Sequence, residues 1–289
     1  MTIDRILFGD NQFFGVNHLS DEKSRAQAMR FGNTEAIMEV LGYVIEADIK
    51  SFMCTTHDRI AQVCEQVRSS PQKFRGFKFL PGMPYAHKYA NAVTELGVVG
   101  ALKQYVPGNL LTAFGKGGIA LARKDFMAIM QLLVDSEMKM FNGLDVPVIF
   151  LQNVITDLLL GLGMKDIFVA FSDYVKNKYN SEAGFITMNL PHLYETLQDC
   201  GLRNTIICAS INTVGFRMAG GKDLYEAVLR KGDMRAIAMQ VFAGGAVPPR
   251  QALEYVCNLS GISSIVFGAS SKAHIEQTKA VIGQYWDLS

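Results

Sequence analysis

The sequence predicts a single (β/α)8 barrel spanning residues 1–289. Short apolar runs rich in β-branched residues alternate with helical patterns along the whole chain, and there are eight such runs. Alternation of this kind forces parallel strands joined by right-handed crossovers, and eight units close into a barrel. A continuously apolar run such as Val146–Leu151 is typical of a sheet that is buried on both faces.

The elements follow in order along the chain. We expect strands at Arg5–Gly9, Lys50–Cys54, Phe74–Leu80, Val146–Leu151, Ala183–Met188, Thr205–Ser210, Arg235–Met239 and Ser263–Phe267. We expect helices at Thr34–Ala47, Arg59–Arg68, Leu193–Cys200, Leu224–Lys231, Pro249–Leu259 and Ser271–Val281. Asn33 can cap the first of these helices. A doubly wound sheet would need a glycine fingerprint after the first strand, and Gly9–Gly15 does not supply one.

Two connections are longer than a plain barrel requires. Phe13–Asn33 follows the first strand, and residues 81–143 separate the third from the fourth with helix-like segments and the glycine-rich run Phe114–Gly118. Long loops at the carboxyl ends of barrel strands often act as lids, whereas an extra packing helix or an oligomer contact would use the same chain. The spacing from Gly108 to Lys116 does not match a P-loop.

Composition limits the partners and the location. The net charge of +1 is spread along the chain, so no basic stripe favours nucleic acid. No secretory signal and no apolar run long enough for a bilayer is apparent, which predicts a cytoplasmic protein with no membrane contact. Five scattered cysteines predict neither a disulfide framework nor a cysteine zinc site. A small molecule is the expected partner, and the oligomeric state stays open.

Polar residues after the predicted strands mark a candidate site, because barrel active sites form at the carboxyl ends of the strands. All five histidines follow strands, and His57 adjoins Asp58, which could orient it for proton transfer. Asp10 ends the first strand and Asn153 the fourth. Lys78 lies between apolar neighbours, so it either points inward near the site with a lowered pKa or snorkels outward.

Four segments of the last third resemble the aldo-keto reductases: Gly184–Asn189, Thr205–Asn212, Ile237–Gly245 and Ala252–Ser271. The resemblance implies an NAD or NADP cofactor. Carried over by position, Asn189 would bind the nicotinamide carboxamide, and Gly244 and Gly245 would approach the pyrophosphate. The remaining positions would face the adenosine phosphate at a helix start, where amides favour an anion: Gly268, Ser270, Ser271 and Lys272.

The chain departs from this family at several positions. Met188 stands where the family has a serine, and Met239 where it has a stacking tyrosine. The family uses a catalytic tetrad of Asp, Tyr, Lys and His. By position, the Asp falls on Met53 or Cys54 and the Tyr on His57 or Asp58. The Lys falls on Lys78, and the His on Gln152 or Asn153. Only Lys78 matches, so the tetrad is degenerate.

Three hypotheses follow. The first is an NAD(P)-linked oxidoreductase acting on a small carbonyl or alcohol, in which His57 transfers the proton, Asp58 orients it, Lys78 adjusts its pKa and Asn153 holds the substrate oxygen. The second is a lyase, isomerase or hydrolase that uses Asp10, His18, His57 and Asp58, with His87 as a further candidate. Such a cluster could hold zinc or manganese, but its spacing matches no metal motif, so metal-free proton transfer is favoured and no metal ligands are predicted. The third is a catalytically silent binding barrel.

Overall fold

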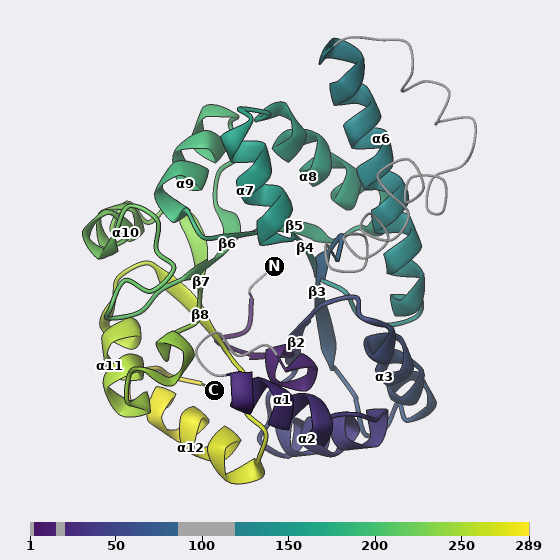
Figure 1. Ribbon diagram of the computed structural model, residues 1–289, viewed down its shortest axis with the longest axis vertical. Helices are drawn as coiled ribbons and strands as arrows, with labels where there is room; N and C mark the ends of the chain where they lie inside the picture. Colours follow the sequence, from purple (N-terminus) through teal and green to yellow (C-terminus); the bar gives the residue numbers. More distant parts are fainter. Residues whose placement is uncertain (1–2, 16–20, 86–118, 289) are drawn as a thin grey trace.

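Eight parallel strands close into a barrel in sequence order in the computed structural model, which describes residues 3–15, 21–85 and 119–288 (Figure 1). The α/β barrel predicted from the sequence is confirmed, with all eight strands in the expected regions. The strands are β1 Ile6–Gly9, β2 Ser51–Cys54, β3 Lys78–Met83, β4 Val148–Leu151, β5 Glu182–Thr187, β6 Thr205–Ser210, β7 Met234–Met239 and β8 Ile262–Phe267.

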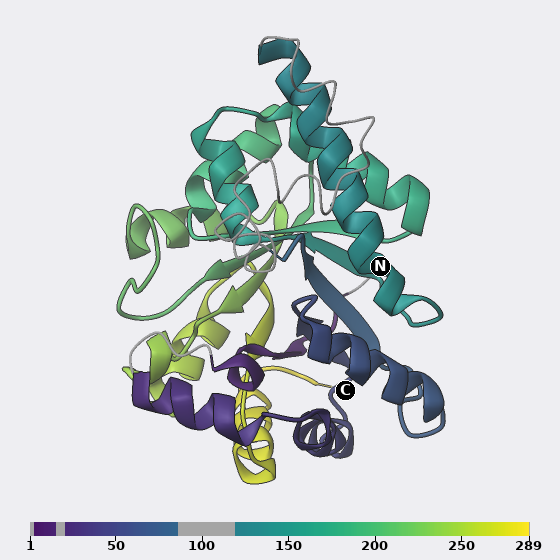
Figure 2. The same ribbon diagram turned by 45° about the vertical axis from the view of Figure 1, so that its right-hand side comes forward.

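The helices surround this barrel (Figures 1 and 2). The six predicted helices are present, and Asn33 caps α2 by accepting the Ala36 N–H at 3.0 Å. The other α-helices of the described chain, α1, α6, α7 and α8, lie in connections for which no helix boundaries were predicted. The full set is α1 Asp21–Arg30, α2 Thr34–Glu46, α3 Asp58–Ser69, α6 Ile119–Met138, α7 Asn153–Gly161, α8 Asp166–Tyr179, α9 Leu190–Asp199, α10 Lys222–Leu229, α11 Pro249–Asn258 and α12 Lys272–Ile282, with single turns η1 Asn11–Phe14, η2 Lys139–Phe141 and η3 Ala243–Gly245.

Successive strand residues face two separate cores, as the period of a strand requires. In β4, Val148 and Phe150 belong to the cluster inside the barrel, whereas Ile149 and Leu151 belong to the layer beneath the helices. The inner cluster also contains Leu7, Met53, Leu80, Ile206, Cys208 and Ile237. The barrel interior is therefore filled by side chains, and space for a ligand has to be sought at its ends.

The boundaries predicted for β3 were wrong, and the error moves a candidate site residue. The prediction was Phe74–Leu80, but the strand runs from Lys78 to Met83, and Lys78 pairs in register with Ser51, the first residue of β2. Phe74 and Phe77 are buried in the turn before the strand. Burial of an apolar run does not distinguish a strand from a packed turn, so the pattern placed the strand too early.

The long connections after β1 and β3 are described in part. After β1 the chain forms η1 and α1, and after β3 it reaches Tyr85 and resumes at α6 on the outside of the barrel (Figure 2). Residues 86–118, including Phe114–Gly118, lie outside the described chain, so a lid formed by residues 81–143 stays a prediction. Among the described helices, none has the length and apolar character needed to cross a membrane.

Replacing Gly184 with alanine should destabilise the barrel. A Cβ at this position of β5 would lie 2.4 Å from ring atoms of Phe150, which is fully buried. Overpacking of this kind costs about 1–3 kcal/mol of unfolding free energy, measurable by urea denaturation. Gly161→Ala is the matched control, because a Cβ there meets nothing within 4 Å. Equal unfolding free energies for the two variants would contradict this packing of the barrel interior.

Candidate functional site

Asp10 follows β1 and joins it to the end of β2. Its side chain is 5% exposed, and Oδ2 accepts the Thr55 N–H at 2.7 Å and the Thr55 hydroxyl at 2.8 Å. Burial raises the pKa of Asp10 from 3.8 to about 6, although both hydrogen bonds from Thr55 act in the opposite direction. Desolvation of the charged form therefore outweighs two donors, and Asp10 titrates close to neutral pH.

His57 lies beside this carboxyl at the start of α3. Its Nδ1 accepts the Arg59 N–H at 3.1 Å, and its ring stacks on Phe14 with 4.3 Å between the centroids. The Arg59 guanidinium lies over the other ring of this pair, 5.1 Å from the Phe14 centroid. Because Nδ1 is an acceptor, the neutral imidazole carries its proton on Nε2 and can donate from there.

Tyr85 is a site residue that the sequence did not reveal. It follows β3, and its ring is inclined by 63° to that of His57 at a centroid distance of 6.1 Å. Burial raises the pKa of Tyr85, the negative charge of Asp10 raises it further, and Arg59 opposes the shift. The phenol therefore keeps its proton at neutral pH, close enough to Asp10 for the two groups to interact electrostatically.

Glu137 on α6 connects the segments that carry His57 and Tyr85. Its side chain is 2% exposed. The carboxylate accepts the Thr56 hydroxyl at 2.5 Å and the Tyr85 N–H at 3.1 and 3.2 Å. This buried acceptor fixes the β2–α3 turn relative to the end of β3. Its partners are distant in sequence, which is why no local pattern indicated it.

The other predicted catalytic residues occupy three different places: Lys78, Asp58 and Asn153. Lys78 is at the amino end of β3, where its Nζ contacts Asp4 at 3.0 and 3.2 Å. The assignment of Lys78 to the family lysine depended on the misplaced strand end and is not supported. Asp58 is exposed at the first turn of α3. Asn153 begins α7 and lines a shallow cavity of about 460 Å³ with Met188 and Met218.

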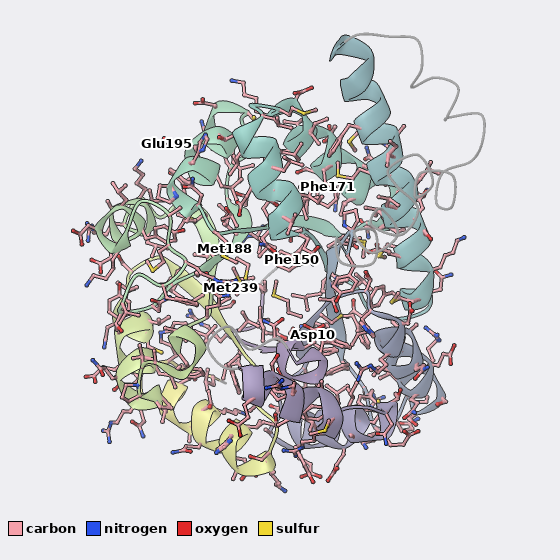
Figure 3. The ribbon with its side chains drawn as sticks, viewed as in Figure 1. Asp10, Phe150, Phe171, Met188, Glu195 and Met239 are labelled. Carbon is pink, nitrogen blue, oxygen red and sulfur yellow. The ribbon has the colours of Figure 1, made fainter. Side chains whose placement is uncertain are left out.

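A separate pocket lies between the carboxyl ends of β7, β8 and β1. Its volume is about 540 Å³, and Gly244, Gly245 and Gly268, three of the predicted cofactor positions, line it. Gln12 from η1 and Gln27 from α1 line it as well. In the view along the barrel, Asp10 lies on one side of the barrel centre, and Met188 and Met239 lie on the other (Figure 3). Met239 also lines this pocket.

The remaining predicted cofactor residues lie outside this pocket. The Asn189 carboxamide caps α9 by accepting the His192 N–H at 3.3 Å. Ser271 caps α12 in the same way, and the Ser270 carbonyl accepts a hydrogen bond from Arg30 of α1. Lys272 is directed to the outer surface, where its Nζ lies 2.7 Å from Glu46 on α2.

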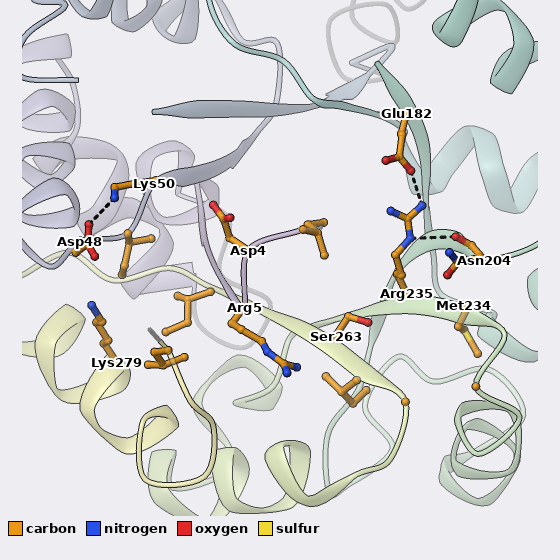
Figure 4. Close-up of a pocket in the computed structure, with 17 residues that line it drawn as sticks. Asp4, Arg5, Asp48, Lys50, Glu182, Asn204, Met234, Arg235, Ser263 and Lys279 are labelled. Atoms are coloured by element: carbon orange, nitrogen blue, oxygen red, sulfur yellow. Dashed lines mark hydrogen bonds and ion pairs between the residues drawn. The ribbon is translucent and has the colours of Figure 1, made fainter. Parts of the chain in front are cut away.

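A larger cavity, of about 1030 Å³, opens at the amino end of the barrel (Figure 4). Its charged side chains are largely paired with one another: Lys50 contacts Asp48 at 3.0 Å, and Arg235 contacts Glu182. Conserved function in such barrels resides at the opposite end, and ion pairs at the amino end serve stability. We therefore place the candidate site at Asp10, His57 and Tyr85.

Residues 3–15, 21–85 and 119–288 contain no group of three or more histidine, cysteine or acidic side chains placed to hold an ion. His18 and His87 lie outside these ranges. Cys54 and Cys208 are buried, and burial raises the pKa of both thiols, which suits the predicted role as small core side chains.

The free energy of unfolding should depend on pH through Asp10. Its pKa is about 6 in the folded protein, against the ordinary aspartate value of 3.8 in the unfolded chain. As the pH rises, the unfolded chain loses this proton first, so stability present below pH 4 is lost as the pH approaches 6. A shift of this size corresponds to roughly 3 kcal/mol. Urea denaturation of wild type and Asp10→Asn at pH 4 and pH 7 measures this effect. If the difference in unfolding free energy between the two proteins is the same at both pH values, the burial of Asp10 is contradicted.

Comparison with solved structures finds the same fold. The chain is similar to a candidate aldo-keto reductase from Pseudomonas aeruginosa, with a TM-score of 0.59 and 11% identity over 97% of this chain and 90% of that one. For the apo form of Gox0644 the TM-score is 0.55 at 9% identity, covering 99% and 89%. For an aldo/keto reductase from Brucella melitensis it is 0.50 at 12% identity, covering 96% and 88%. No protein-family model and no curated protein matches the chain. At these identities the likeness to aldo-keto reductases is one of fold.

Proposed function

We propose that the protein is an oxidoreductase that acts on a small carbonyl or alcohol with a nicotinamide cofactor, and that Asp10, Tyr85 and His57 replace the catalytic tetrad of the aldo-keto reductases. The observation that carries this proposal is the buried Asp10, whose pKa of about 6 suits proton exchange near neutral pH. The likeness in fold supports the choice of reaction class as an analogy.

The three side chains have complementary roles in proton transfer. The Tyr85 hydroxyl holds its proton at neutral pH, so it can donate to a substrate carbonyl oxygen as that oxygen becomes an alkoxide. When Tyr85 has given up its proton, a protonated Asp10 can supply the proton that restores the phenol, and Asp10 itself becomes a carboxylate. His57 is the second donor through its Nε2–H, because Nδ1 accepts the Arg59 N–H. Phe14 limits the rotation of the imidazole by stacking on it.

The pocket beside β7 and β8 fits the donor-bearing parts of a nicotinamide cofactor. The Oε1 atoms of Gln12 and Gln27 are buried and have no hydrogen-bond partner among the described residues. Ribose hydroxyls and a carboxamide supply the donors that such oxygens need. Gly245 leaves open space where a Cβ would lie. A nicotinamide cofactor bound there would supply or accept hydride.

A second candidate is a non-redox enzyme, such as a lyase, isomerase or hydrolase, that uses the same three residues. One observation favours it: Lys272, predicted to face a cofactor phosphate, is paired with Glu46 on the outer surface. A carboxylate whose pKa lies near neutrality can abstract a proton next to a carbonyl without any cofactor. This candidate keeps Asp10 as the base and requires no hydride acceptor.

Titration with NADPH, NADP, NADH and NAD separates the two candidates. A ligand that binds only the folded state raises the melting temperature predictably, and a concentration of 100 times Kd adds about 2.7 kcal/mol of stability. Saturable binding of one of the four, seen by thermal shift and by nicotinamide fluorescence, is the expected result. No binding at millimolar concentration would overturn the oxidoreductase and leave the non-redox candidate.

Once a carbonyl screen has identified a substrate, Asp10→Asn should lower kcat by about 10²–10⁴, the usual contribution of a positioned acid or base. Tyr85→Phe should have an effect of similar direction, because it removes the proposed donor. Substrate binding should change little in either variant. Asp199→Asn, at an exposed carboxylate on α9, is the control for loss of a negative charge. Full activity of Asp10→Asn would eliminate Asp10 from the mechanism.

A further inference from the structure

We propose that the pocket between β7 and β8 selects an uncharged group bearing neighbouring hydroxyls, and that Gln12 and Gln27 recognise it. The proposal builds on the proposed function, because it states which chemistry the pocket beside the acid–base cluster takes. Neither glutamine belongs to the segments that resemble the aldo-keto reductases. Both come from η1 and α1, the extra chain inserted after β1.

The side-chain amide oxygens of Gln12 and Gln27 are buried acceptors without a donor in the described chain. Gln12 is 6% exposed, and its Nε2 donates to the Gly9 carbonyl at 2.8 Å, which identifies the other atom as the oxygen. That oxygen, like Oε1 of Gln27, is buried without a hydrogen-bond partner in the described chain. Buried acceptors are costly unless a donor reaches them. Both residues line the pocket, so a rotation of each side-chain amide would bring its oxygen to a donor-bearing ligand there.

The lining of the pocket is uncharged in the described chain. None of its lining residues in the described chain is acidic or basic. Pro248 and Pro249 stand at the start of α11, so this helix lacks two of the amide N–H groups that usually attract an anion there. A phosphate or carboxylate offers only acceptors, and it would face the two glutamine oxygens without compensation.

The size and the walls of the pocket also suit a sugar ring. A methyl group on Gly268 would lie 2.0 Å from Oε1 of Gln12, so glycine at this position is what allows the amide to approach the pocket wall. Phe242, Val247 and Met239 supply apolar surface on the lining. A pocket of about 540 Å³ with apolar walls and two acceptors suits a sugar ring, whose hydroxyls donate while its C–H faces pack.

Two sources share this chemistry: the ribose of a nucleotide cofactor and a free sugar. The probes are therefore NADH, methyl β-D-ribofuranoside, its 2,3-dideoxy analogue, D-glucose and inorganic pyrophosphate, each titrated into the full chain by calorimetry. We expect saturable binding of the riboside, binding at least tenfold weaker for the dideoxy analogue, and no binding of pyrophosphate. If NADH binds, the hydroxyl-bearing group is the ribose of the cofactor. If glucose binds and NADH does not, the natural ligand is a free sugar.

Gln12→Leu and Gln27→Leu should each weaken riboside binding at least tenfold, and Gln284→Leu, an exposed glutamine near the C-terminus, should not. Equal affinity of wild type for the riboside and the dideoxy analogue would overturn the proposal. This comparison uses wild type alone, so it does not depend on whether the variants fold. Preferential binding of pyrophosphate would overturn it as well. Riboside binding without NADH binding would instead reject the proposed cofactor while leaving this inference intact.

Discussion

The junction between Asp10 and Thr55 is the interaction on which the candidate site depends. It ties the end of β1 to the end of β2 through a backbone N–H and a hydroxyl. The parallel barrel brings these ends to one rim, and η1 then covers the carboxylate until it is almost fully buried. Burial is what raises the pKa of Asp10 to about 6, since its hydrogen bonds alone would lower it.

Glu137 extends this arrangement to the chain that follows β3. By accepting hydrogen bonds from Thr56 and from the Tyr85 backbone, it holds the donors His57 and Tyr85 at a fixed separation. The insertion after β3 thus contributes to the site through a buried carboxylate on α6. Likewise, the insertion after β1 contributes η1 and α1, which bring Gln12 and Gln27 to the neighbouring pocket. The described parts of both connections therefore contribute side chains to the candidate site and to its neighbouring pocket.

The fold could be predicted from sequence because strand and helix periods are local. The site could be predicted only in part. Asp10 and His57 do follow β1 and β2, as predicted, because polar residues directly after a strand reach the carboxyl rim; their role in catalysis stays a prediction. Lys78 was misplaced because buried Phe74 and Phe77 continue the apolar pattern before the strand begins. Tyr85 and Glu137 were missed because their contacts join segments 52 residues apart, and no local pattern encodes a tertiary hydrogen bond.

The central claim is that a buried carboxyl beside Tyr85 and His57 titrates near neutral pH. The most direct test is a carbon-13 NMR titration of the Asp10 side-chain carboxyl in the full chain, assigned by its loss in Asp10→Asn. The expected midpoint is about pH 6. A midpoint near 3.8, the ordinary value for an aspartate, would mean that the carboxyl is solvated, and it would contradict the role given to Asp10.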